Sequence, residues 1–195
     1  MENGKLDRRA QRTREQLQQA LTELMAEKNY DSITVQDITE RANLGRTTFY
    51  AHFNSKTDLY LHAHFEAVAR MGQDSLTMDQ LLAPEPPDYF VKFLEFIARD
   101  RATQINLSFS QDVLIIVRAM RQHVSDIVER CLRGLFSEES SHIPFTVLAN
   151  YLGGAQVELV GWWLVSHSSL SPQELARYYQ RLQRATLLDA LQLAR

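Results

Sequence analysis

Hydrophobic residues recur along the chain at intervals of three and four positions, and no segment alternates apolar and polar residues as a strand does. This spacing is typical of amphipathic helices and predicts an all-α protein. The helices are expected at about 10–27, 35–41, 46–53, 56–71, 89–97, 103–109, 111–136, 144–166 and from 172 onward. Because the proline-rich stretch 72–88 interrupts this pattern, we predict two domains, at 1–71 and 72–195.

Capping residues predict two short helices joined by a tight turn after residue 33. Thr34 and Asp37 have the spacing of a capping box, and Ile33 and Ile38 fit the hydrophobic staple that often accompanies it. Asn43 tolerates the left-handed backbone that a tight turn requires, and a second short helix follows. This layout indicates a helix-turn-helix, whose second helix lies in the major groove of DNA.

The second helix of this unit divides into an apolar face and a polar face. Phe49 and Phe53 lie one turn apart and are predicted to face the core. The outward side chains available to DNA are Arg46, Thr47, Tyr50 and His52. Ser55 and Asp58 repeat the capping box for the next helix, which places Lys56 at a helix N-terminus, where a phosphate binds readily. Without further support, ordinary packing of a small helical bundle is an equally good interpretation.

This stretch closely resembles the N-terminal DNA-binding domain of the TetR family of bacterial transcriptional regulators, over about residues 8–70. The resemblance is carried by Thr34-Val35-x-x-Ile38-x-x-x-Ala42, Thr48-Phe49-Tyr50-x-His52-Phe53 and Ser55-Lys56-x-x-Leu59. It implies that the residues contacting phosphates or facing the groove are Thr34, Thr48, Tyr50, His52 and Lys56. Arg46 stands where the family commonly has Lys, and we predict that it reads guanine. Two positions depart from the family pattern: Asn43 replaces a glycine, and Gly45 replaces a hydroxyl residue.

The net charge of −3 does not exclude a nucleic-acid partner, because its distribution along the chain is uneven. Residues 5–14 carry five basic residues against one acidic residue, whereas residues 61–195 carry twelve basic and fifteen acidic residues. A basic arm at the start of the first helix suits contact with the DNA backbone. A solvated helix start is the alternative interpretation.

The sequence contains little that indicates other chemistry. Cys131 is the single cysteine, which excludes an internal disulfide and a cysteine-based zinc site, and His62 and His64 point apart on a helix. We therefore predict no metal and no cofactor, and the absence of a catalytic motif argues against an enzyme. The chain has neither an apolar run of 18 residues nor an apolar leader at its start, so we expect a cytoplasmic protein with no membrane segment.

A helix-turn-helix protein usually reads DNA as a symmetric dimer, because two recognition helices match successive major grooves. TetR-like proteins pair through their last two helices, which here carry more apolar surface than a small bundle readily buries. The residues that we predict for a homodimer interface are Tyr151, Ala155, Leu159, Trp162, Trp163, Tyr178 and Leu182. For any one of them, burial inside the protomer is an equally good interpretation.

The resemblance also implies a small-molecule pocket in the C-terminal domain, whose occupancy changes the affinity for DNA. The apolar residues predicted to line it are Phe93, Phe96, Ile97, Phe109, Leu114, Val117 and Met120. The polar anchors predicted beside them are Asn106, Gln111 and Gln156. An aromatic and methionine stripe is more often packed core, which is the competing interpretation.

The leading hypothesis is therefore a dimeric transcriptional repressor that binds a palindromic operator on double-stranded DNA and is released by a small-molecule effector. Trp162-Trp163-Leu164 followed by Ser171-Pro172-x-Glu174 further resembles TetR-like regulators related to the dihydroxyacetone kinase operon. Some of those act as activators with a protein co-regulator. The alternatives left open are a partner-dependent activator without a small-molecule ligand and a helical protein-interaction module.

Overall fold

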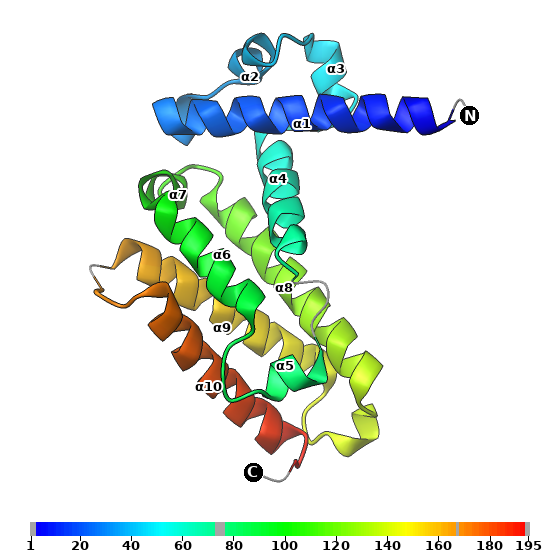
Figure 1. Cartoon of the computed structure of the whole chain (residues 1–195), viewed down its shortest axis with the longest axis vertical. Helices are drawn as coiled ribbons and strands as arrows, with labels where there is room; N and C mark the ends of the chain where they lie inside the picture. Colours follow the sequence, from blue (N-terminus) through cyan, green and yellow to red (C-terminus); the bar gives the residue numbers. More distant parts are fainter. Residues whose placement is uncertain (1–2, 73–76, 167, 194–195) are drawn as a thin grey trace.

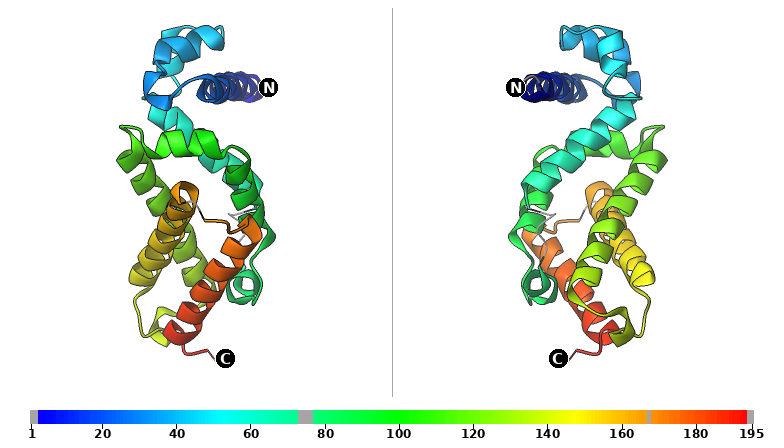
Figure 2. Two further views of the ribbon diagram at one scale, coloured as in Figure 1. Left: turned by 90° about the vertical axis from the view of Figure 1, so that its left-hand side faces the viewer. Right: turned by 90° about the vertical axis from the view of Figure 1, so that its right-hand side faces the viewer.

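The computed structural model describes residues 3–72, 77–166 and 168–193, and over these residues the chain is all-α with no strand. This confirms the predicted fold class. The first three α-helices lie together at one end of the molecule and are α1 (Asn3–Glu27), α2 (Val35–Arg41) and α3 (Arg46–Tyr50). Helix α4 (Lys56–Arg70) runs from them into the remaining helices, and the chain ends at the opposite end (Figures 1 and 2).

The rest of the chain forms a helical bundle. Its helices are α5 (Met78–Leu82), α6 (Asp88–Arg99), α7 (Arg101–Ser108), α8 (Val113–Leu135), α9 (Phe145–Val165) and α10 (Pro172–Ala190). Helix α9 is buried along most of its length and packs closely against α8, while α10 lies against α5 and α6. None of these helices, within the residues described, has the length and apolar character needed to cross a membrane.

Several helix bounds differ from the prediction. Helix α1 begins at Asn3 rather than near Ala10, because residues 5–9 contain neither glycine nor proline and the helix continues through them. Helix α3 ends at Tyr50, so His52 lies in the turn that follows it. Helix α5 was not predicted at all, since the prolines of 72–88 indicated a linker; residues 73–76 of that predicted boundary lie outside the described residues.

A single apolar cluster holds the first three helices and α4 in place. The largest fully buried side chains in it are Leu17, Leu21, Tyr30, Ile38, Phe49, Phe53 and Leu59. Phe49 and Phe53 both face this core, as predicted, and their ring centroids are 6.0 Å apart. The short helix α3 is therefore fixed by its buried aromatic face, which leaves its other face at the surface.

Candidate DNA-binding surface and effector cavity

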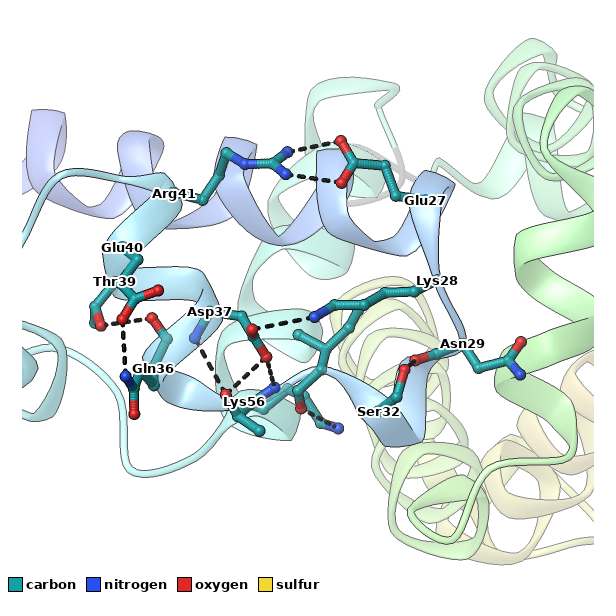
Figure 3. A network of polar contacts seen from close by, with 12 residues as sticks. Glu27, Lys28, Asn29, Ser32, Gln36, Asp37, Thr39, Glu40, Arg41 and Lys56 are labelled. Atoms are coloured by element: carbon teal, nitrogen blue, oxygen red, sulfur yellow. Dashed lines mark hydrogen bonds and ion pairs between the residues drawn. The ribbon is translucent and has the colours of Figure 1, made fainter.

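The capping box predicted at the start of α2 is present. Thr34 Oγ1 accepts a hydrogen bond from the backbone N–H of Asp37 at 3.1 Å, and the Thr34 N–H donates to Asp37 Oδ2 at 2.7 Å. The Thr34 hydroxyl, the Thr34 N–H and an ion pair with Lys28 together lower the pKa of Asp37 to about 2. Figure 3 shows the Asp37 carboxylate and its ion pair with Lys28. These contacts fix the start of the first helix of the pair.

The turn between α2 and α3 is built around one left-handed residue. Asn43 has φ 52°, as its place in the sequence predicted, and the N–H of Leu44 donates to the carbonyl of Thr39 at 2.9 Å. Gly45 then occupies the N-cap of α3 in an extended conformation, which a non-glycine residue also adopts. Asparagine thus supplies the turn geometry that the family pattern assigns to glycine.

Helix α3 presents a polar surface beyond its buried face. Arg46 and Thr47 are exposed, Thr48 and His52 are half-buried, and Tyr50 is 57% exposed. The Arg46 guanidinium donates from Nη2 to Gln36 Oε1 of α2 at 2.7 Å. Because Gln36 is itself exposed, this contact orients the arginine without removing it from solvent.

Lys56 is directed into the protein and not toward the surface where a phosphate would lie. Its Nζ donates to the carbonyls of Tyr30 and Ile33 at 2.6 and 2.9 Å, and it lies 4.0 Å from the centroid of the Tyr30 ring. Burial lowers the pKa of this ammonium group. The structure therefore gives Lys56 a role that differs from the predicted phosphate contact: it ties the α1–α2 connection to the start of α4.

A cavity of about 110 Å³ lies between α4, α6, α7, α8 and α9. Five of the ten predicted pocket residues line it, namely Phe93, Ile97, Val117, Met120 and Gln156. The other five do not contribute to its wall and are exposed at the surface: Phe96, Asn106, Phe109, Gln111 and Leu114. The predicted stripe includes these five residues because apolar side chains extend round more of α6 and of the α7–α8 segment than the face that these elements bury.

Helix α4 contributes a wall of the cavity that the sequence did not indicate. Its residues His64, Phe65 and Val68 line the same space as the C-terminal helices. These were missed because α4 was assigned to the DNA-binding unit alone. The sequence did contain a signal for this contribution of α4 to the cavity. His64 and Phe65 continue an apolar face beyond the part of α4 that the first three helices can cover. The cavity therefore touches both parts of the molecule.

The outer surface of α9 and α10 carries large exposed apolar side chains. Tyr151 and Trp162 on α9 are 60% and 51% exposed, and Tyr178 and Leu182 on α10 are 53% and 65% exposed. Ala155 and Leu159 are half-buried beside them. We call these six residues the α9–α10 face.

Trp163 is the exception among the residues predicted for this surface. It is 2% exposed, and its indole N–H donates to the carbonyl of Leu170 at 2.9 Å. Adjacent residues on a helix point about 100° apart, so Trp162 and Trp163 could not both face outward. The sequence alone does not show which of the two tryptophans is buried in the core.

Residues 17–63 match the pattern that defines the bacterial regulatory proteins of the tetR family, over the same residues that build the helix-turn-helix and its support. This segment of the chain is therefore similar to the DNA-binding domain of tetR family regulators. Among the described residues, no group of three or more His, Cys, Asp or Glu side chains is arranged to hold a metal ion.

Known proteins resemble this chain over most of its length. It is 29% identical over 181 residues to YxbF of Bacillus subtilis (strain 168), an uncharacterised HTH-type transcriptional regulator; the match covers 89% of the chain but 45% of that relative's length. A TetR transcriptional regulator from Streptococcus agalactiae 2603V shares 25% identity with a TM-score of 0.58, covering 91% of this chain and 96% of that one. The TetR family repressor AlkX from Dietzia sp. strain DQ12-45-1b has the same fold, with a TM-score of 0.56 and 13% identity. That match covers 91% of this chain and 96% of AlkX.

Replacing Lys56 with methionine is expected to lower the free energy of unfolding by about 1–2 kcal/mol, because two hydrogen bonds to a charged group are lost. Urea denaturation followed by circular dichroism measures the change. Lys92→Met, at an exposed position on α6, is the matched control and should leave stability unchanged. Unchanged stability together with a smaller salt dependence of DNA binding would instead restore the predicted phosphate contact for Lys56.

Proposed function

We propose that this protein is a TetR family repressor that acts in the cytoplasm, binds a palindromic operator as a homodimer and leaves it when a small molecule occupies the cavity. The observation that carries the DNA-reading part is the exposed guanidinium of Arg46 at the N-terminus of α3, held by Gln36. In helix-turn-helix proteins, residues at this end of the second helix reach base edges. The hydroxyl, phenol and imidazole groups that we assign to phosphate contacts lie at the N-cap of α2, on α3 and in the turn after it: Thr34, Thr47, Thr48, Tyr50 and His52.

The dimer is supported by the α9–α10 face. Exposed aromatic and leucine side chains grouped on two neighbouring helices are unusual on a monomer in water, and they indicate a covered interface. The same patch on a second copy would complement it through a two-fold axis. To read successive major grooves, such a pair would have to present its two copies of α3 on one side of the DNA, about 34–36 Å apart.

Coupling between the cavity and DNA is supported by contacts at the start of α8. The Thr57 hydroxyl donates to Asp112 Oδ2 at 2.5 Å, and the Gln111 N–H lies 3.2 Å from Asp31 Oδ1. Asp31 belongs to the DNA-binding unit, and the residues that follow Asp112 on α8 line the cavity. A ligand that shifts α8 or α4 would thereby change the position of α3, and a coupling of about 1–3 kcal/mol suffices for regulation.

A second function, as a regulator that acts with a protein partner, is favoured by a different observation. Phe109, Leu114 and Ile115 are exposed beside the junction of the two parts, at 76%, 80% and 59%. A protein co-regulator covering this patch would contact both the DNA-binding unit and α8. Loss of transcriptional control on Leu114→Ser, with unchanged operator binding by the purified protein, would favour this second function.

Replacing Arg46 with alanine is expected to weaken operator binding by about 1–3 kcal/mol while leaving binding to random duplex DNA nearly unchanged. Fluorescence anisotropy on a fragment from beside the protein's own gene, and on a scrambled duplex, measures both affinities. Arg130→Ala, an exposed arginine on α8, is the matched control. Equal losses on the two duplexes would show that Arg46 grips the backbone and does not read bases.

A further inference from the structure

Gln156 is a buried polar residue whose amide the protein does not use. It is 7% exposed and lines the cavity, and its side chain makes no hydrogen bond with any residue that the structure describes. Neighbouring α9 residues on the same wall, Val157 and Val160, are apolar. Burying an amide without a hydrogen-bonding partner is costly, so this position indicates a group that arrives with a ligand.

Among the described residues, the cavity wall carries no carboxylate, lysine or arginine side chain. Its titratable side chains are His64, His123 and the Tyr89 phenol. Burial and, secondarily, the nearby His123 lower the pKa of His64 to about 4, so His64 is neutral at pH 7. A charged ligand would therefore lose its hydration without gaining an ion pair to a carboxylate, lysine or arginine of the described wall.

The size of the cavity and the rings around it restrict the ligand further. About 110 Å³ is somewhat smaller than the roughly 150 Å³ apolar cavity that binds benzene in another protein. Phe93 meets His64 edge-on with ring centroids 5.9 Å apart, and Phe65 stacks on His123 at 4.1 Å. Aromatic walls of this kind favour a flat ring over a long flexible chain.

We infer that the cavity binds an uncharged molecule with a single aromatic ring and one hydrogen-bonding substituent, with the ring among the apolar side chains and the substituent on the Gln156 amide. A phenol has this chemistry. The inference rests on the proposed effector function and names the chemical class of the effector.

Isothermal titration calorimetry of the 195-residue protein with phenol, toluene and benzoate at pH 7.5 tests this class directly. Phenol should bind roughly fivefold to tenfold more tightly than toluene, because it adds one hydrogen bond, and benzoate should bind at least tenfold more weakly than phenol. Gln156→Leu should remove the preference for phenol over toluene. Gln122→Leu, the same change at an exposed position of α8, should leave that preference intact.

A second variant blocks the cavity without removing a structural contact. Gly161 lines the wall, and a Cβ built there meets no atom within 4 Å. Gly161→Leu should therefore place its side chain in the cavity, keep the thermal midpoint at or above that of the wild type, and weaken phenol and toluene at least tenfold.

Three results would overturn the inference: benzoate binding as tightly as phenol, no effect of Gln156→Leu on phenol, or no binding of any of the three compounds. Operator binding, measured on the same protein without ligand, is an independent readout. If phenol binds but operator binding fails, the proposed DNA function is wrong and the ligand class stands. If operator binding holds but phenol does not bind, the ligand class alone is wrong.

Discussion

Replacing Leu182 with glutamate is expected to convert the protein to monomers and to weaken operator binding by roughly 100-fold or more, the loss that follows when two linked contacts become one. Leu182 is 65% exposed on α10, one helical turn from the exposed Tyr178, and it belongs to the α9–α10 face. A carboxylate there would be buried against the apolar surface of the second protomer, which costs more than the interface can offset. Analytical ultracentrifugation and fluorescence anisotropy measure the two effects.

Leu114→Glu is the matched control for this experiment. Leu114 is 80% exposed on α8 and lies outside the α9–α10 face, so the substitution adds the same charge at an exposed leucine without touching the proposed interface. It should leave both the dimer and operator affinity unchanged. A dimer that survives Leu182→Glu would show that the protomers pair through another surface.

Replacing Gly153 with alanine is expected to lower the free energy of unfolding by about 3 kcal/mol, at the upper end of the cost of overpacking. A Cβ at this position would clash with Ser125 Oγ and lie 2.9 Å from the Ser125 backbone N, where α8 and α9 pack together. The backbone atom cannot move aside as a flexible side chain does, so the two helices must separate. Chemical denaturation monitored by circular dichroism measures the loss.

Alanine variants of two other glycines of α9 are the controls for this prediction. They measure the general effect of alanine in a helix without the clash at Ser125. Gly154→Ala meets only the side chain of Arg121, at 2.9 Å, which can rotate away, and Gly161→Ala meets no atom within 4 Å. Both should be neutral or slightly stabilising, because alanine favours a helix over glycine. If Gly153→Ala were as stable as these two, α8 and α9 would not pack as closely as the structure has them.

Features fixed by neighbouring residues could be predicted from the sequence. The bounds of α2 follow from the capping box of Thr34 and Asp37, and the left-handed turn follows from Asn43, because both depend on contacts within a few residues. Helix α5 was missed, although its start is also determined by neighbouring residues. The prolines around it indicated a linker, although Thr77 and Gln80 form a capping box of their own.

Features that depend on distant parts of the chain could not be predicted. Lys56 turns inward because the carbonyls of Tyr30 and Ile33 lie beside it in the fold, far from it in sequence. Likewise, the cavity includes His64 because α4 packs against α8, and a helical pattern alone does not say which neighbour covers each face. Sequence therefore defined the type of DNA-reading unit, while the roles of single side chains required the tertiary structure.

The most direct test of the account is an in vitro selection of duplexes from a random-sequence pool by the purified protein. We expect enrichment of an inverted repeat whose half-sites lie about one helical turn apart or a multiple of it, with a guanine in each half-site that Arg46→Ala no longer selects. Enrichment of no sequence, or of a single half-site without its inverted copy, would contradict the claim that a symmetric pair of α3 helices reads DNA.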